Sequence, residues 1–217
     1  MIDEGYIKFQ SHWEKTGPLP LAGLEELIRW RRPLHDAGLI GHYDEPGVGY
    51  GNLSTRATDE GLFLISGTQT GHITSIGPTH FALVTDYDIE RNTICCRGPV
   101  EASSESMTHA AAYDASPLVR CVLHAHSPVL WDRRRELGLP ETDPAVPSGT
   151  PGMALEVGRL YRETVLPERG ILAMGGHEDG IMVLGQSPEE AGGILLRWLS
   201  RAYAVSCSET DRGLCRP

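Results

Sequence analysis

The hydrophobic pattern alternates between two periods along most of the chain. Apolar positions at helical spacing predict helices over residues 21–39, 107–115, 129–137, 152–166 and 187–205. Short apolar runs bounded by glycine, proline or polar residues predict strands over residues 5–13, 39–44, 47–55, 62–66, 81–86, 93–97, 118–126, 171–174 and 181–184. Pro33 is expected to kink or break the first helix. Because several strands are spaced like hairpins, the pattern predicts an α/β domain with a mixed or antiparallel sheet covered by helices.

Nothing in the pattern separates two domains. No Gly/Ser-rich or charged linker interrupts the 217 residues, and 40% of them are apolar, which is enough for one core. We therefore expect a single domain over residues 1–205 and a polar, flexible tail over residues 206–217. We expect no secretory signal and no membrane span, because no segment has the required apolar length. The five cysteines show no CxxC spacing, so we interpret them as reduced thiols of a cytoplasmic protein.

The charge of the chain argues against some classes of partner. The net charge is −10, the isoelectric point is about 5.3, and no basic stripe is present. We therefore expect neither a nucleic-acid partner nor an anionic membrane. The densest basic cluster, Arg133–Arg135, lies on a predicted helix and is more simply explained as a solvated face. No GxGxxG or GxxxxGK(S/T) motif follows a predicted strand, so nucleotide binding is unsupported.

The strand predicted at residues 118–126 ends on two histidines, His124 and His126. Side chains two residues apart on a strand lie on the same face, so the two imidazoles are expected side by side. Two neutral imidazoles in this arrangement are a ready pair of metal ligands, and a catalytic site needs a third. His177 is the best candidate because it lies in a Gly-Gly turn directly after a predicted strand. The competing interpretation is an ordinary histidine at that turn.

A pair of serines and a glutamate, Ser103, Ser104 and Glu105, precede the helix predicted at residues 107–115. Either serine is a natural N-cap, and a glutamate in the first turn suits the helix dipole. Glu105 can therefore be explained as a helix-start residue, but its position upstream of the histidine pair also makes it a candidate acid or base. His109 is expected on the same helix face, and we interpret it as a partner that orients the carboxylate.

A turn rich in glycine and hydroxyl groups, Ser66–Gly71, follows the strand predicted at residues 62–66. Such a turn can direct several backbone N–H groups and hydroxyls toward one anion. Taken alone, an ordinary loop is the more common interpretation of this pattern.

Five motifs in the same order give the chain its resemblance to a known family. They are Gly51–Ser54, Thr68–Gly71, Ser103–Glu105, His124–His126 and the glycine-flanked His177. With these motifs the chain resembles the class II aldolase/adducin family from about residue 5 to residue 205. The resemblance implies a three-layer αβα sandwich around a mixed, mostly antiparallel sheet. It also implies a homotetramer with active sites between subunits.

The resemblance assigns roles to the residues of these motifs. His124, His126 and His177 would bind a divalent metal, most often Zn²⁺, with Mn²⁺, Co²⁺ or Fe²⁺ as alternatives. Glu105 would be the catalytic acid and base. A substrate phosphate would be held by Asn52, Thr70, Gly71, Ser103 and Ser104. Neutral hydroxyls and backbone amides would explain how an acidic protein binds an anion without a basic patch.

The implied reaction is retro-aldol cleavage of a small phosphorylated ketose by a metal-dependent lyase, through a metal-stabilised enediolate. Two departures from the family pattern bear on it. No counterpart of the tyrosine that protonates the leaving aldehyde occurs between Trp131 and Thr150, and two acids, Glu178 and Asp179, follow His177. The same scaffold also hosts dehydratases acting on methylthioribulose phosphate, epimerases and decarboxylases, which are the alternative reactions. A non-catalytic module like the adducin head is the alternative outside enzymes.

Overall fold

The computed structural model describes residues 5–20, 23–45, 47–58 and 61–214, and the side chains of this part as far as residue 206. The expected domain start at Met1, the helix start at Leu21 and the end of the tail at Pro217 lie outside the described residues. An eight-stranded sheet forms the middle of the described part.

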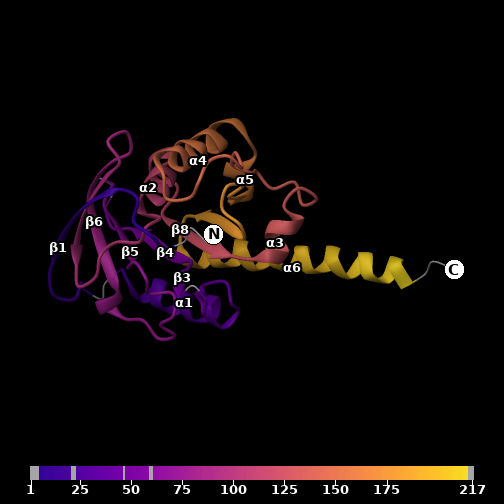
Figure 1. The fold of residues 1–217 in the computed structure, drawn as a ribbon, viewed down its shortest axis with the longest axis horizontal. Helices are drawn as coiled ribbons and strands as arrows, with labels where there is room; N and C mark the ends of the chain where they lie inside the picture. Colours follow the sequence, from indigo (N-terminus) through magenta and orange to yellow (C-terminus); the bar gives the residue numbers. More distant parts are fainter. Residues whose placement is uncertain (1–4, 21–22, 46, 59–60, 215–217) are drawn as a thin grey trace.

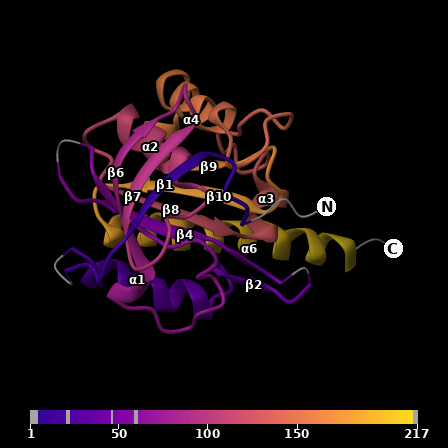
Figure 2. The same cartoon turned by 60° about the vertical axis from the view of Figure 1, so that its left-hand side comes forward.

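The strands of the sheet occur in an order that brings distant parts of the chain together. In space they are β1 (Gln10–Lys15), β7 (Thr93–Gly98), β6 (Phe81–Asp88), β5 (Phe63–Ser66), β4 (Asn52–Arg56), β8 (Cys121–His126), β10 (Gly180–Gly185) and β9 (Ile171–Ala173). β1 and β7 run parallel at one edge (Figure 2), and the other neighbouring pairs are antiparallel. A separate hairpin consists of β2 (Gly41–Tyr43) and β3 (Val48–Tyr50). The prediction of a mixed, mostly antiparallel sheet is confirmed.

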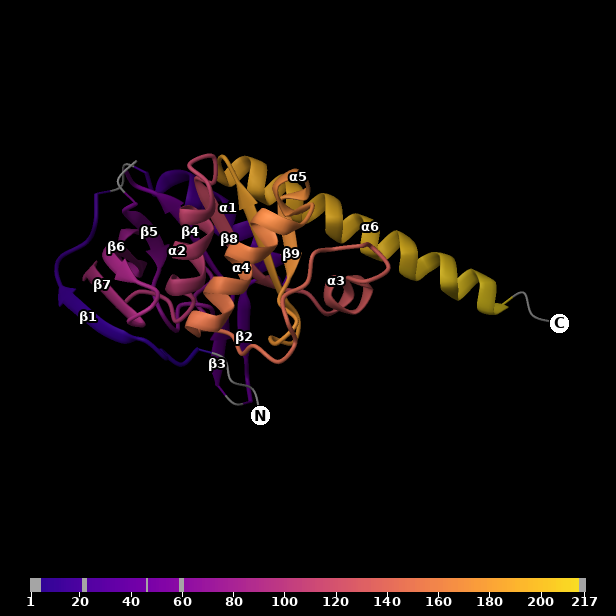
Figure 3. The same cartoon turned by 90° about the horizontal axis from the view of Figure 1, so that it is seen from above.

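Helices cover both faces of this sheet, which gives the αβα sandwich (Figure 1). One face is covered by α2 (Ser106–Ala115) and α4 (Pro151–Glu163), and the other by α1 (Glu25–Asp36), α3 (Pro128–Arg133) and α6 (Pro188–Leu214). Two short helices, η1 (Pro78–His80) and α5 (Leu166–Arg169), lie in connections. The far end of α6 extends past the rest of the molecule (Figure 3). None of the helices in the described part is both long and apolar enough to cross a membrane.

The central strand β8 divides the core into two halves. Val122 packs in the apolar cluster beneath α2 and α4, whereas Leu123 packs in the cluster beneath α1 and α6. Both side chains are fully buried, and each such burial stabilises the fold by about 1.5–3 kcal/mol. Because side chains alternate along a strand, His124 and His126 lie on the same face as Val122. The site is therefore on the α2/α4 face of the sheet.

Helix α4 on this face and helix α3 on the other face both begin at side-chain caps. Thr150 Oγ1 accepts a hydrogen bond from Met153 N at 3.3 Å, and Pro151 occupies the first position of α4. Ser127 Oγ accepts from Leu130 N at 3.4 Å at the start of α3. Each cap satisfies an N–H group that has no partner within its own helix. The direction in which the chain leaves β8 is fixed in this way.

Most of the predicted elements are present, but several have different ends. The strand predicted at residues 5–13 is β1, which begins at Gln10. Pro33 lies inside α1 and does not end that helix, so the expected break is absent. The helix predicted at residues 129–137 ends at Arg133, and α5 was not predicted. The last helix continues to Leu214 instead of ending near residue 205, so most of the expected tail is helical.

Candidate active site

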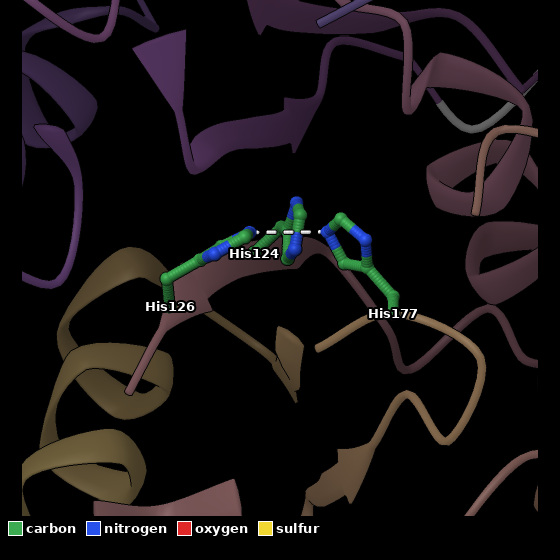
Figure 4. Close-up of side chains that lie close together, drawn as sticks. All are labelled: His124, His126 and His177. Atoms are coloured by element: carbon green, nitrogen blue, oxygen red, sulfur yellow. Dashed lines mark hydrogen bonds between the residues drawn. The ribbon is translucent and has the colours of Figure 1, made fainter. Parts of the chain in front are cut away.

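Three histidines from two segments of the chain meet at one end of the sheet (Figure 4). His124 and His126 project from β8, and His177 projects from the turn between β9 and β10. Nε2 of His126 lies 3.0 Å from Nε2 of His177, and the three rings offer ligand atoms within 4.8 Å of one another. All three side chains are buried. The structure thus brings together the three residues that the sequence predicted as ligands.

The turn that carries His177 depends on its glycines. A Cβ atom at Gly176 would lie 1.9 Å from the carbonyl oxygen of Val146, and one at Gly175 would lie 2.3 Å from that of Thr142. The turn therefore packs directly against the backbone of the segment 142–146. Hydrogen bonds from His177 N to Met174 O at 3.0 Å and from Gly180 N to His177 O at 2.9 Å close it. Together these contacts hold the His177 imidazole toward β8.

Two of the imidazoles have a hydrogen-bonding partner at the ring nitrogen Nδ1. The hydroxyl of Tyr43 lies 2.9 Å from Nδ1 of His126, and the side-chain nitrogen of Asn52 lies 3.3 Å from Nδ1 of His124. The Asn52 oxygen Oδ1 is buried without a hydrogen-bond partner in the described structure. Turning the amide by 180° would let Oδ1 accept a hydrogen bond from Nδ1–H of His124, and Nε2 of that ring would then keep its lone pair. An acceptor at Nδ1 is the usual arrangement for a metal-binding histidine.

The donor set fits a divalent transition-metal ion. Zinc–nitrogen bonds of about 2.0–2.1 Å place two ligands of a tetrahedral site about 3.3 Å apart. The 3.0 Å separation of the His126 and His177 nitrogens is close to that value. Three neutral imidazoles suit zinc and several neighbouring metals equally, so the set does not select one ion. His124, His126 and His177 are the residues that would hold such an ion.

A hollow beside the histidines is lined by small and hydroxyl-bearing residues. All five residues predicted for the phosphate lie along it: Asn52, Thr70, Gly71, Ser103 and Ser104. Three further lining residues, Gly67, Thr68 and Gln69, belong to the turn that the sequence indicated as a possible anion-binding turn. The sequence did not single out Gly5, Gly49 or Gly51 as ligands. Repeated glycines within Gly47–Gly51 and Gly67–Gly71 were the available signal, because they permit close backbone approach. A Cβ atom on Gly71 would lie 2.1 Å from Gly41 O.

Glu105 stands at the N-terminus of α2, directly after the hollow. Its side chain is 3% exposed, and Thr108 Oγ1 donates a hydrogen bond to Glu105 Oε2 at 3.0 Å. The N-cap position belongs to Glu105 itself, so the prediction of Ser103 or Ser104 as the cap is wrong. The serines form the preceding turn, in which Ser103 Oγ accepts from Glu105 N at 3.3 Å. Since the Glu105 side chain makes no capping bond, its carboxylate is not used to start the helix.

The sequence analysis expected His109 to orient the Glu105 carboxylate, but the His109 ring bonds elsewhere. Its Nδ1 lies 2.7 Å from Ser54 Oγ, which in turn lies 2.6 Å from the Tyr113 hydroxyl. His109 Nε2 is buried without a hydrogen-bond partner in the described structure. Burial lowers the pKa of His109 to about 3, so the ring is neutral near pH 7. The residue belongs to a buried network that joins α2 to β4.

The two additional acids are not members of the histidine cluster. The group of ligand atoms within 4.8 Å, searched over the described residues, contains histidines alone. Glu178 is exposed, and Asp179 is partly buried with a left-handed backbone, at φ 63°. Burial raises the pKa of Asp179, and the nearby His126 acts in the opposite direction. Asp179 contributes its backbone instead, because its carbonyl accepts from Ser127 N at 2.9 Å.

The hairpin of β2 and β3 places two tyrosines against His126 of the histidine cluster. The Tyr50 ring lies 5.0 Å from the His126 ring between centroids, and the Tyr43 and Tyr50 rings lie 4.5 Å apart. Sequence reasoning missed both residues. The available signal was an aromatic residue on each strand of a glycine-rich hairpin next to the Gly51–Ser54 motif.

Comparison with known proteins agrees with this fold and site. The model of the class II aldolase and adducin N-terminal domain matches residues 26–195. L-fuculose-1-phosphate aldolase from Thermus thermophilus has a similar structure, with a TM-score of 0.65 and 21% identity over 88% of this chain and 96% of that chain. The structure of YgbL from Escherichia coli is similar with a TM-score of 0.63 and 18% identity, over 86% of this chain and 89% of that chain. The structure of sugar-phosphate aldolase from Thermotoga maritima is similar with a TM-score of 0.67 and 13% identity, over 90% of this chain and 97% of that chain.

Sequence comparison with curated proteins gives no match. The family model nevertheless spans well over half of the chain, and the fold agrees with that of solved class II aldolases. The chain therefore belongs to the class II aldolase and adducin family.

Proposed function

We propose that this protein is a divalent-metal-dependent lyase that cleaves a small phosphorylated ketose by retro-aldol chemistry. One observation carries the proposal, namely that Asn52 joins two sites. Its side chain lines the hydroxyl-rich hollow and also lies 3.3 Å from a nitrogen of His124. A phosphate in the hollow would therefore lie beside the metal-binding histidines. This is the arrangement that a phosphorylated substrate with a nearby carbonyl requires.

The phosphate end of the substrate is assigned to neutral groups. The side chains of Asn52, Thr70, Ser103 and Ser104 and the backbone of Gly71 line the hollow. Hydroxyls and backbone N–H groups can donate several hydrogen bonds to one phosphate.

The reacting end of the substrate is assigned to Glu105 and the histidine cluster. A divalent ion bound by the histidines would supply a Lewis acid for the substrate carbonyl. In retro-aldol cleavage the hydroxyl next to the breaking bond loses its proton and becomes the aldehyde carbonyl. The carbon–carbon bond breaks, its electron pair stays on the carbon beside the ketone carbonyl, and that carbon later takes a proton. Glu105 is positioned for this proton because it follows Ser104 of the hollow and is buried.

The similar structures support the substrate class and the resemblance supports the assembly. Two of them bear the names fuculose-1-phosphate aldolase and sugar-phosphate aldolase. We therefore expect a phosphorylated sugar as the substrate, and a cytoplasmic homotetramer as the working form. Light scattering on the purified protein would measure the assembly directly, and a monomer would contradict that part of the proposal.

Metal analysis and a substrate screen test the proposed reaction. Purified protein should carry about one divalent ion per chain, and the His124→Ala variant should lose it. A set of ketose phosphates is then incubated with the metal-loaded protein, and release of a three-carbon ketose phosphate and an aldehyde is measured. Glu105→Gln should lower the rate by about 10²–10⁴-fold while keeping the metal.

The matched control for Glu105 is Glu168→Gln, which neutralises an exposed acid on α5 at the opposite end of the sheet. It should turn over substrate at the wild-type rate. Loss of water without carbon–carbon cleavage would show that the protein is a dehydratase and not an aldolase. Absence of bound metal, or equal activity of Glu105→Gln and wild type, would refute the proposal.

A further inference from the structure

An arginine that was not part of the expected site lies directly behind the hollow. Arg31, on α1, is 2% exposed and is among the largest fully buried side chains. Its Nη2 donates hydrogen bonds to three backbone carbonyls, those of Gly71 at 2.9 Å, Ile73 at 3.2 Å and Thr70 at 3.4 Å. Two of these three residues line the hollow. Arg31 thus holds the backbone of the loop without lining the hollow itself.

The buried charge of Arg31 has no anionic partner. Within the described residues no carboxylate bonds or pairs with it, and Nη1 has no hydrogen-bond partner. Burial lowers the pKa of Arg31 to about 10, so the guanidinium stays protonated at neutral pH. After burial itself, this charge is also the largest cause of the lowered pKa of His35. A buried cation is costly to the fold unless an opposite charge or strong dipoles compensate it.

Peptide geometry connects this charge to the hollow. The C=O and N–H groups of a trans peptide point in opposite directions. Since the Thr70 carbonyl faces Arg31, the N–H group of Gly71 is turned away from the guanidinium. That N–H group makes no hydrogen bond within the described part of the chain. Gly49, which also lines the hollow, lies against this nitrogen, where a Cβ atom would be 3.0 Å away.

The hollow itself offers no charge for an anion. The lining side chains are glycine, serine, threonine, asparagine and glutamine, so none of the described lining residues is charged. The surrounding protein is acidic, with a net charge of −10. A dianionic phosphate ester bound there would need a positive group close by. Besides an ion held by the neighbouring histidines, Arg31 is a cation that contacts the loop of the hollow.

We propose that Arg31 is a positioning residue for a phosphate monoester in the hollow, where it orients the Thr70–Ile73 backbone and supplies the positive charge that the lining lacks. This inference rests on the proposed function for the identity of the anion. The guanidinium acts through the peptide dipoles and not by direct contact. The bound anion in turn compensates the charge of Arg31.

Binding of inorganic phosphate to the metal-loaded protein tests the proposal without any turnover. Calorimetry is performed on wild type and on three variants, Arg31→Lys, Arg31→Gln and Arg32→Gln. Arg31→Gln should weaken phosphate binding at least tenfold, and Arg31→Lys should retain more affinity than Arg31→Gln because it keeps the charge. Arg32→Gln should bind like wild type, since Arg32 is exposed on the same helix and pairs with Asp36. Wild-type affinity in Arg31→Gln, or equal affinities of the Lys and Gln variants, would overturn the proposal.

A second measurement covers variants that fail to fold. In the wild-type protein, nitrogen NMR of the Arg31 side chain should show a shift on addition of inorganic phosphate. Unchanged Arg31 signals at saturating phosphate would overturn the proposal. Metal content, which Arg31 should not affect, is measured in parallel. A protein that binds phosphate through Arg31 but cleaves no ketose phosphate would refute the proposed function while leaving this inference intact.

Discussion

Tyr43 places its hydroxyl 2.9 Å from Nδ1 of His126, and this contact predicts its effect on metal binding. When the Tyr43 oxygen accepts a hydrogen bond from Nδ1–H of His126, Nε2 of that ring keeps a lone pair that can bind a metal. Tyr43→Phe removes the acceptor and should weaken metal binding by about 10–100-fold. Competition with a chromophoric chelator measures the affinity.

Tyr50→Phe is the matched control for this prediction. It removes a hydroxyl that donates to Gly38 O at 3.2 Å and keeps the ring that lies against His126. Metal affinity should stay within about twofold of wild type. Equal losses in the two variants would mean that packing of the hairpin, and not the Tyr43 hydroxyl, sets the affinity.

Because His109 is buried and neutral, we expect the free energy of unfolding to depend on pH. Burial lowers its folded-state pKa from 6.5 to about 3, so the unfolded chain binds a proton in this window that the folded chain does not. The contribution to stability is complete above pH 6.5 and is lost as the pH falls toward 3. One such group changes the free energy of unfolding by at most about 1.4 kcal/mol per pH unit.

Urea unfolding at several pH values, with excess chelator present, checks this prediction. His109→Gln should unfold with a smaller pH dependence between pH 6 and 4 than wild type, whereas substitution of the exposed His12 should leave the dependence unchanged. An identical slope in wild type and His109→Gln would show that the ring is protonated in the folded protein.

Residues joined by short spacing could be predicted from the sequence, and residues joined by the fold could not. His124 and His126 share a face because they are two apart on one strand, and this required no knowledge of the fold. Tyr43 reaches His126, and Arg31 reaches Gly71, from other elements of the chain. No local pattern reports such a contact, since it depends on where the elements pack.

At the scale of elements, the turn between β9 and β10 determines whether His177 can reach the other histidines. A Cβ atom at Gly176 would be 1.9 Å from Val146 O, so Gly176→Ala must displace the turn or the segment beside it. The expected results are a loss of stability of about 1–3 kcal/mol and weaker metal binding. Thermal unfolding of the metal-free protein and chelator competition measure the two effects.

Gly193→Ala is the control for a general effect of replacing glycine. It lies on α6, where the nearest atom to a new Cβ is the end of the flexible Arg197 side chain at 3.4 Å. The variant should gain up to about 1 kcal/mol of stability, because alanine favours the helix. If Gly176→Ala matched wild type in both measurements, the close packing of the turn would not be what positions His177.

The positions of the elements were predicted better than their ends. β1 was placed too early because its pairing with β7 is parallel and distant in sequence, while its own residues are mostly polar. α6 was ended too early because the polar sequence of its continuation lacks the apolar spacing that marks a helix. Pro33 did not end α1, since it stands in the last turn, where few intrahelical hydrogen bonds remain to be lost.

At the scale of the whole molecule, one sheet carries two cores and ends in the site. The alternation along β8 gives Leu123 to one core and Val122 to the other, and the same alternation directs the histidines toward α2 and α4. The fold class could be predicted because hairpin spacing and family motifs agree. The strand order could not, because it joins β4 to β8 across more than sixty residues.

Because the histidine cluster joins β8 to the turn after β9, removal of an ion bound there should affect the stability of the whole fold. An ion that binds the folded chain alone stabilises it by about 4 kcal/mol when present at 1,000 times its Kd. Excess chelator should therefore lower the melting temperature of wild type, and the added ion should restore it. His124→Ala should melt at one temperature with or without chelator, because it lacks a ligand.

Exposed histidines do not join distant elements, so a variant of His12 should respond to chelator as wild type does. A wild-type protein whose melting temperature ignores both chelator and added ion would contradict the assignment of His124, His126 and His177 as metal ligands.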